Sequence, residues 1–241
     1  MSRTLPDYRA VWDRKPVLGT VYGDMYDRIA KHCAAGPSLE VGGGVGNLKE
    51  WMPGLISSDI QLSPWLDLVS DAQRLPFADG FLGNIVEIDV LHHVEFPIRF
   101  LREAARVLRP GGRLVMVEPA ITPGSTLFYR LVHPEPVIMS ADPLVDGEPD
   151  PTRDPYASNQ AIPTLLAGRD RERLHRAVPG LRIVDVSRFA FLAYPLSGGF
   201  QSWSLVSPWA ARKLLRLERA IERRAGPLLA FRMLMVMEKL G

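Results

Sequence analysis

Four glycines within five positions constrain this chain more than any other feature of its sequence. They lie in the stretch SLEVGGGVGN (38–47) and are Gly42, Gly43, Gly44 and Gly46. Glycine loses more conformational freedom on folding than any other residue, so it is used where the backbone turns left-handed or approaches another group closely. The residues before the glycines predict a strand and those after them a short helix. The cluster therefore lies where open α/β sheets bind ligands, at the carboxyl end of a strand.

The spacing of the glycines favours one class of ligand. Together with Glu40 they form the pattern E-x-G-x-G-x-G, and no Gly-Lys-Ser/Thr follows to grip a phosphate. The carboxylate of Glu40 would repel a pyrophosphate, but it could accept hydrogen bonds from an ammonium or a hydroxyl group. The loop therefore favours a zwitterionic or cationic nucleoside over a dinucleotide.

Strand and helix patterns alternate in short units around this loop. After an irregular start at 1–19, apolar residues at helical spacing predict a helix over 20–33. Further helices are expected at 47–52 and 98–108, and strands at 38–41, 55–59, 66–71, 84–91 and 113–118. Such alternation is typical of an α/β fold with a parallel sheet.

The pattern changes after residue 119. Residues 120–168 are rich in proline and show no sustained period, and a stretch of that length inside a compact domain is usually functional or disordered. A strand over 181–194, a helix over 207–226 and a strand over 229–239 follow. We expect one domain over 1–241.

Composition excludes several classes of protein. The chain has 241 residues, 46% of them apolar, and a formal net charge of +2, which is too small for the dense basic surface of a typical nucleic-acid binder. The single cysteine, Cys33, excludes an internal disulfide and a thiolate metal cluster. The first ten residues lack the apolar core of a signal peptide, and no run of 18 apolar residues occurs. These features predict a cytoplasmic protein without a nucleic-acid partner.

Residues 38–119 resemble the core of the class I S-adenosylmethionine-dependent methyltransferases, above all the type 11 group that includes the ubiquinone and menaquinone C-methyltransferases. The matching segments occur in the order of that family and are LEVGGGVGN, SSDI, SDAQRLPFADGFLGNIVEIDVLHHV and AARVLRPGGRLVMVEP. The resemblance implies a doubly wound, Rossmann-like sheet of seven mostly parallel strands with an antiparallel last strand. It also implies a substrate lid inserted after the fifth strand, at 120–180, between core segments at 20–119 and 181–241.

The same resemblance implies S-adenosyl-L-methionine as the cofactor and assigns residues to it by position. Glu40 would lie beside the methionine amino group, and Asp59 would bind the ribose hydroxyls. Asp71 would lie near the adenine amine, and Asp89 would face the reactive end of the cofactor. The full set is Glu40, Gly42, Gly43, Gly44, Gly46, Asn47, Asp59, Ile60, Asp71, Ala72 and Asp89. Only twelve residues separate Gly46 from Asp59, fewer than the family generally has, so the helix between them must be short.

Catalytic and acceptor-binding candidates follow the fourth strand. His92 and His93 are candidates for a general base because the pKa of histidine lies near neutrality. Methyl transfer from a sulfonium often needs little beyond positioning, so a structural role for both histidines is the alternative. The acceptor-pocket candidates are His133, Glu135, Tyr156, Asn159 and Tyr194. No metal site is expected.

The leading functional hypothesis is methyl transfer to a small-molecule or lipid-linked acceptor. A catalytically silent S-adenosylmethionine-binding scaffold or regulatory protein and a nicotinamide-dependent oxidoreductase are the alternatives. The basic helix expected at 207–226 either presents a solvated face or contacts an anionic membrane surface. The sequence does not indicate the acceptor, the atom methylated or the oligomeric state.

Overall fold

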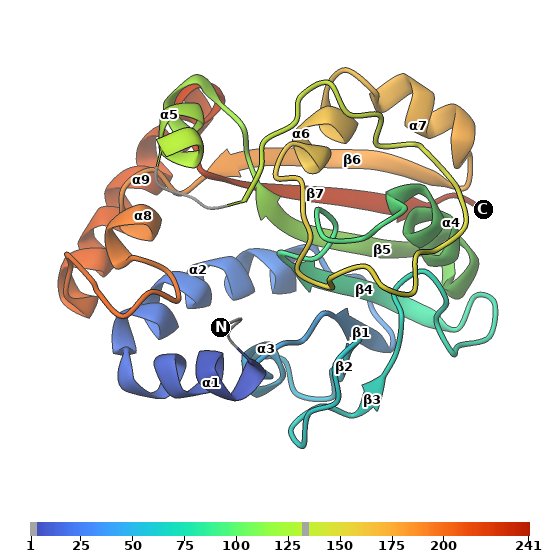
Figure 1. Ribbon diagram of the computed structural model, residues 1–241, viewed down its shortest axis with the longest axis horizontal. Coiled ribbons are helices and arrows are strands. Elements are labelled where there is room, and N and C mark those ends of the chain that lie inside the picture. The colour runs from blue at the N-terminus through green and yellow to red at the C-terminus, as the bar shows by residue number, and fades with distance from the viewer. Residues whose placement is uncertain (1–3, 132–134) are drawn as a thin grey trace.

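The computed structural model describes residues 4–131 and 135–241, and the structural statements that follow refer to these residues. A seven-stranded sheet forms the centre of the molecule, in the order β3-β2-β1-β4-β5-β7-β6 (Figure 1). The neighbours from β3 to β5 pair in parallel, whereas β7 runs antiparallel to both β5 and β6. The strands are β1 (Ser38–Val41), β2 (Ile56–Asp59), β3 (Leu68–Val69), β4 (Leu82–Ile88), β5 (Leu108–Pro119), β6 (Leu181–Phe189) and β7 (Arg232–Lys239). The predicted fold class is confirmed, including the antiparallel last strand.

Helices cover both faces of the sheet and bury a separate apolar cluster on each. One cluster is formed mainly with α4, α6 and α7, and the other mainly with α2 and α9. Because both faces are covered, β4 and the second half of β5 are buried at nearly every residue rather than at alternating ones. The helices are α1 (Leu5–Arg14), α2 (Pro16–His32), α3 (Asn47–Trp51), α4 (Pro97–Val107), α5 (Pro123–Leu131), α6 (Ile162–Ala167), α7 (Arg171–Ala177), α8 (Ala193–Ser197) and α9 (Pro208–Leu229). None of the helices described combines the length and the apolar character that crossing a membrane requires.

The amino-terminal segment is helical where an irregular stretch was expected. Thr4 caps α1, because its backbone N–H and its hydroxyl both donate to Asp7 Oδ2 at 2.8 Å. Pro6 and Pro16 lie in the first turns of α1 and α2, where the missing proline N–H costs no helical hydrogen bond. The expectation of an irregular segment was therefore wrong for residues 5–19.

Several strands and helices end at other residues than expected. Asp89 and Ala190 both adopt a positive φ of 61°, so β4 ends at Ile88 and β6 at Phe189, each short of its predicted end. Helix α9 continues past its predicted end through Pro227, which lies in the last turn and removes only one hydrogen bond. These changes leave the order of elements intact.

The proline-rich segment after β5 is only partly irregular, since it contains α5 and α6. It is fastened to the turn that follows β4: Asn159 N–H donates to the His92 carbonyl at 2.9 Å, and Arg153 Nη1 donates to the His93 carbonyl at 2.8 Å. The segment thus lies over the carboxyl end of the sheet, where the chain crosses in front of β4 and β5 in Figure 1.

Candidate active site

A cavity of about 750 Å³ opens at the carboxyl ends of the central strands. Its wall combines the glycine loop, the end of β4 with the turn after it, parts of α2 and α5, the segment that follows α5, the region around α8 and the first residue of β7. The predicted site residues in this wall are Glu40, Gly42, Gly43, Gly44, Asn47, Asp89, His92, His93, Glu135, Tyr156 and Tyr194. The fold thus brings residues from both predicted halves of the site, cofactor and acceptor, to one cavity.

The backbone of the glycine loop requires glycine for two separate reasons. Gly42, Gly44 and Gly46 have φ values of 67°, 50° and 76°, in the left-handed region that favours glycine. A Cβ on Gly42 would lie 2.2 Å from Val90 Cγ2, and one on Gly43 would lie 2.2 Å from the hydroxyl of Ser57. A Cβ on Gly44 would meet no atom closer than 3.8 Å. Gly44 therefore faces open space in the cavity wall, while its neighbours pack against the strands.

Glu40 and Asn47 place an acceptor and a donor beside this loop. Glu40 is 7% exposed, and the Ser57 hydroxyl donates to its Oε2. Burial raises the pKa of Glu40 to about 7, although the Ser57 hydrogen bond opposes the shift. Asn47 is also buried, and its Nδ2 has no hydrogen-bond partner among the described residues. A carboxylate acceptor, an unsatisfied amide donor and a glycine cradle fit the ammonium and carboxylate of the methionine end of S-adenosylmethionine.

Five residues assigned to the cofactor lie outside the cavity wall, and they are Gly46, Asp59, Ile60, Asp71 and Ala72. Asp59 ends β2 as expected, but its carboxylate accepts the backbone N–H groups of Gly44, at 3.0 Å, and Gln61, at 2.9 Å. Asp71 is exposed, and its Oδ1 accepts the N–H of Gln73 at 2.8 Å. Asp59 thus ties the glycine loop to the end of β2, and its contact with the ribose stays a prediction.

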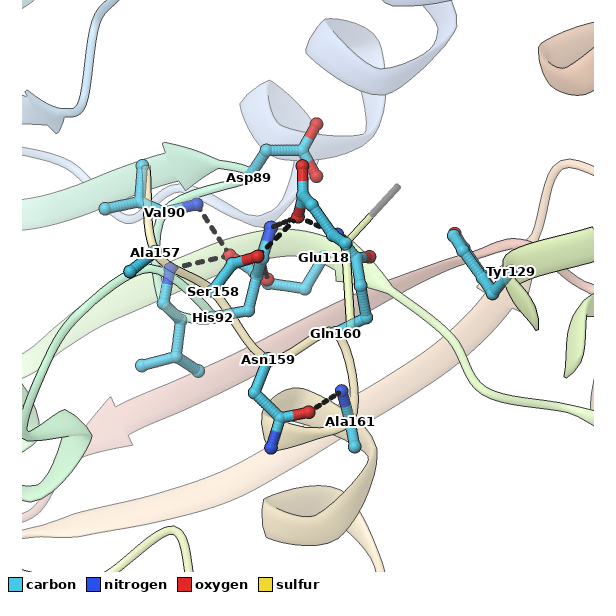
Figure 2. A network of polar contacts seen from close by, with 12 residues as sticks. Asp89, Val90, His92, Glu118, Tyr129, Ala157, Ser158, Asn159, Gln160 and Ala161 are labelled. Carbon is cyan, nitrogen blue, oxygen red and sulfur yellow. Dashed lines mark hydrogen bonds and ion pairs between the residues drawn. The ribbon is translucent and has the colours of Figure 1, made fainter. Parts of the chain in front are cut away.

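His92 lies in a buried ion-pair network at the end of β4 (Figure 2). Its Nδ1 is 2.5 Å from Glu118 Oε2, and its Nε2 is 3.6 Å from Glu135 Oε2. Glu118 Oε1 also accepts the N–H groups of Val90 and Leu91, at 2.8 and 2.7 Å. Burial alone would lower the pKa of His92, but the Glu118 carboxylate raises it to about 10. His92 is therefore an imidazolium at neutral pH, held between two carboxylates.

His93 differs from its neighbour in charge and in contacts. The two rings lie 4.2 Å apart, and both line the cavity. Burial and the positive charge of His92 lower the pKa of His93, so its ring is neutral at pH 7. Its Nδ1 has no hydrogen-bond partner among the described residues. Of the two histidines that the sequence could not distinguish, His93 is the one able to accept a proton.

The same cluster offers ligands that a divalent metal ion could use. Ligand atoms of His92, His93 and Glu135 lie within 4.8 Å of one another, and two imidazoles with a carboxylate suit transition metals. The sequence had suggested no such site. Protonated His92 already forms ion pairs with Glu118 and Glu135, so these carboxylates do not need a metal ion as a partner.

The acceptor candidates have separate surroundings. Glu135 Oε2 accepts the hydroxyl of Ser158 at 2.7 Å and the amide of Gln160. The Tyr156 hydroxyl accepts Gln61 Nε2 at 2.9 Å, which links the segment after α5 to the end of β2. Asn159 is beside the network in Figure 2, but it hydrogen-bonds Ile138 and is not part of the cavity wall. His133 lies outside the described residues.

Sequence reasoning missed several residues of the cavity and of its support. Glu118 and Arg232 are buried charged residues at the ends of apolar strands, in RLVMVEP and RMLMVME, and that position is the signal that could have revealed them. The aromatic residues missed in the cavity wall are Tyr8, Tyr22, Tyr26, Phe128, Tyr129, Phe200 and Trp203. Single aromatic residues in helices and loops carry no pattern that separates a cavity wall from a core.

Comparison with known proteins agrees with the kind of ligand that the glycine loop suggests. Residues 39–116 match the model of a family described as a methyltransferase domain. The demethylmenaquinone methyltransferase of Mycolicibacterium vanbaalenii is 42% identical over 88 residues, which are 34% of this chain and 37% of that protein. The 27-O-demethylrifamycin SV methyltransferase of Amycolatopsis mediterranei is 39% identical over 54 residues, 22% and 20% of the two chains. The matched part thus spans well under half the length of these curated relatives.

Among solved structures, the geranyl diphosphate C-methyltransferase of Streptomyces coelicolor covers 91% of this chain and 79% of its own, with 14% identity and a TM-score of 0.48. The similarity is carried by the family match over residues 39–116 and by the glycine loop, which the strand order places at the carboxyl edge of the sheet. Residues 39–116 of this chain are thus similar to a methyltransferase domain.

Proposed function

We propose that this chain transfers the methyl group of S-adenosyl-L-methionine to a small-molecule or lipid-linked acceptor bound in the same cavity. The proposal rests on one observation: different groups of residues line the cavity on the two sides of Asp89. The glycine loop, Glu40 and Asn47 lie on the β1 side, whereas His93 and Glu135 follow β4 and β5. One cavity thus has room and suitable groups for a donor and for an acceptor.

On the donor side, the residues of this chain bind the methionine end of S-adenosylmethionine and orient it. Glu40 accepts hydrogen bonds from the methionine ammonium, and the Asn47 amide donates to the methionine carboxylate. The space left open at Gly44 admits the chain of the amino acid. When bound, the cofactor supplies a methyl group already activated by the sulfonium charge, so the site needs to supply mainly alignment and exclusion of water.

On the acceptor side, His93 takes the proton when the acceptor carries one. Its neutral ring and the unsatisfied Nδ1 suit this role. His92 acts differently, because its ion pairs with Glu118 and Glu135 fix the turn from which His93 projects. The segment 135–160 is fastened to this turn, and we assign it the role of the lid that excludes water.

Turnover of the purified protein tests the proposal. With methyl-labelled S-adenosylmethionine and a bacterial small-molecule and lipid extract, we expect S-adenosylhomocysteine and a labelled product identified by mass spectrometry. His93→Gln should lower the rate about 100-fold for an acceptor that carries a proton, with unchanged affinity for S-adenosylhomocysteine. Cofactor binding without any labelled product would favour the catalytically silent scaffold instead.

The surface of α9 favours a lipid-linked acceptor and contact with an anionic membrane. Trp209, Leu217 and Ile221 are 60%, 66% and 50% exposed along this helix. The exposed basic residues among them are Arg212, Lys213, Arg216, Arg223 and Arg224, whereas Arg219 forms an ion pair with Asp24 of α2. Basic residues interleaved with exposed large apolar residues are typical of helices that lie on anionic membranes.

Both acidic residues of α9 point away from this surface. Glu218 is buried and accepts three backbone N–H groups from 191–193, while Glu222 forms an ion pair with Arg28 at 2.8 Å. Trp203 lies just before the helix, is 43% exposed and also lines the cavity. An acceptor anchored in lipid would therefore reach the cavity beside the membrane-facing surface.

Co-sedimentation with vesicles tests the membrane contact. We expect binding to vesicles of phosphatidylglycerol and phosphatidylcholine but not of phosphatidylcholine alone. Arg212→Gln with Arg216→Gln should weaken binding about tenfold or more, since each basic residue near such a surface contributes about 1 kcal/mol. The matched control, Arg74→Gln with Arg176→Gln, removes two exposed arginines outside α9 and should bind as the wild type does. Equal loss in both double variants would refute a role for α9.

A further inference from the structure

Arg232 is the most deeply buried basic residue that the structure describes. It is 2% exposed, although it lines the cavity. Moving a charged group out of water costs several kcal/mol unless it is paired and fully hydrogen-bonded. A guanidinium in such a place therefore needs partners for its five N–H donors.

The described residues satisfy this guanidinium only in part. Nη2 lies 2.6 Å from Asp89 Oδ1, but the angles of this ion pair do not meet those of a hydrogen bond. Nε has no hydrogen-bond partner among the described residues. The ring of Tyr194 lies 4.9 Å from the guanidinium carbon, a cation–π contact that leaves the N–H edges unused. Arg232 thus keeps donor capacity inside a cavity.

The phenols around Arg232 add no negative charge to that of Asp89. Burial raises the pKa of Tyr22 and of Tyr194 above the usual value for tyrosine, and it also raises the pKa of Tyr129, so all three stay neutral. Asp89 is held at a strained φ of 61°, and its side chain is 31% exposed. The hydrogen-bonding capacity of Nε and Nη2 that Asp89 leaves unused is therefore available to a ligand.

The topology places that ligand on the acceptor side. Arg232 begins β7 and lies in register with Pro119, the last residue of β5, and with Phe189. The glycine loop follows β1, and β4 and β5 lie between β1 and β7 in the sheet. Asp89, at the end of β4, therefore stands between the cradle for the donor and the guanidinium.

We propose that Arg232 binds an anionic oxygen of the methyl acceptor, which is therefore a carboxylate, phenolate or enolate rather than a neutral molecule. This inference rests on the proposed function, because it divides the cavity into donor and acceptor sides. For a phenol or an enol, the proton passes to His93 and Arg232 stabilises the resulting anion. The electron pair of the anion then forms the new bond to the methyl carbon as the carbon–sulfur bond breaks, and its electrons stay on sulfur as a neutral thioether.

Calorimetry on protein saturated with S-adenosylhomocysteine tests this, with 2-naphthoate and the neutral 2-naphthamide as probes. The wild type should bind the carboxylate about tenfold or more tightly than the amide, as a charge-assisted hydrogen bond implies. Arg232→Gln should abolish the preference, and Arg232→Lys should retain part of it because the charge remains. Arg113→Gln is the matched control: it breaks the Arg113–Glu238 pair in the same sheet, away from the cavity, and should keep the full preference.

Three results would overturn the inference. The first is equal affinity of the wild type for the two probes, or no binding of 2-naphthoate. The second is a preference that persists in Arg232→Gln. The third is a loss of S-adenosylhomocysteine affinity in Arg232→Gln with unchanged affinity for methylthioadenosine, which lacks the carboxylate; it would assign Arg232 to the cofactor. Melting curves of Arg232→Gln and Arg232→Lys verify folding. A wild type that does not bind S-adenosylhomocysteine would instead refute the proposed function.

Discussion

Two buried carboxylates at and beside the cavity have pKa values shifted in opposite directions, because their partners differ. Glu40 faces a neutral hydroxyl, so burial raises its pKa to about 7. For Glu118, burial alone would raise the pKa, but the positive charge of His92 lowers it to about 2. Glu40 on β1 and Glu118 on β5, two strands separated by β4, thus differ in pKa, which suits one for reversible binding and the other for a permanent ion pair.

The pKa of Glu40 predicts a pH dependence of cofactor binding. Above about pH 7 the carboxylate accepts the methionine ammonium, and below it a proton competes. Affinity for S-adenosylhomocysteine should therefore rise between about pH 6 and 8, by up to about tenfold per pH unit, and calorimetry measures it. Glu40→Gln should bind weakly with no such slope, and an unchanged slope in this variant would exclude Glu40 as its source.

The pH dependence that Glu40 gives to stability is opposite to the one that it gives to cofactor affinity: its contribution to stability falls as the pH rises. Its pKa in the folded protein, about 7, exceeds the ordinary glutamate value of 4.5, so the folded state holds the proton more tightly. The contribution of Glu40 to the free energy of unfolding is therefore greatest below pH 4.5 and falls as the pH rises to about 7.

The His92–Glu118 pair predicts a stability difference with a defined pH window. His92→Gln leaves Glu118 buried without its cation and should lower the free energy of unfolding by about 3–5 kcal/mol. The contribution of His92 is complete below pH 6.5 and is lost as the pH rises through about 10, and that of Glu118 is complete above pH 4.5 and is lost as the pH falls through about 2. Urea unfolding near pH 5.5 and near pH 10 checks this. A difference between wild type and variant that does not shrink at high pH would contradict the ion pair.

At the scale of the element, the buried carboxylate of Glu218 holds α9 against the turn after β6. Glu218 accepts the N–H groups of Phe191, Leu192 and Ala193 at 3.1, 2.8 and 2.8 Å. Glu218→Ala leaves these donors without a partner and should cost about 2–4 kcal/mol in urea unfolding. Glu172→Ala removes an exposed glutamate of α7 and should change stability by less than about 0.5 kcal/mol. Equal effects of the two variants would show that the Glu218 contacts contribute nothing.

The sequence predicts elements well where local chemistry decides them. The glycine loop between β1 and α3 was correctly located because its left-handed turns favour glycine, which the sequence shows directly. Pro6 and Pro16 misled the prediction of 1–19, since proline is compatible with a first helical turn as well as with a loop. The ends of β4 and β6 could not be predicted from the sequence, because the positive φ of Asp89 and of Ala190 is imposed by surrounding structure rather than by residue type.

At the scale of the molecule, the two halves of the cavity differ in how much of them the sequence reveals. The glycine loop of the proposed donor side comes from one contiguous stretch, 40–47, so the sequence shows it as a motif. The rest of the cavity wall is assembled from α2, α5, the segment 135–160, the region of α8 and the start of β7, which only the fold brings together. Arg232 was missed for this reason, because its role depends on β7 lying between β5 and β6.

The central claim is that the glycine loop opens this cavity to S-adenosylmethionine. Substitutions at two glycines with left-handed backbone, one inside the cavity wall and one outside it, separate an effect on binding from the effect of backbone strain. Gly44 and Gly54 have φ values of 50° and 85°, and a Cβ on either meets nothing close, but only Gly44 lies in the cavity wall. Both arginine variants should therefore bear a similar strain of about 1–2 kcal/mol, which melting curves can verify.

Calorimetric titration of S-adenosylmethionine into both variants and the wild type is the decisive measurement. Gly54→Arg should bind within about threefold of the wild type, and Gly44→Arg should lose at least about 100-fold in affinity, or more than about 2.7 kcal/mol. Undiminished binding by a folded Gly44→Arg variant would contradict the account.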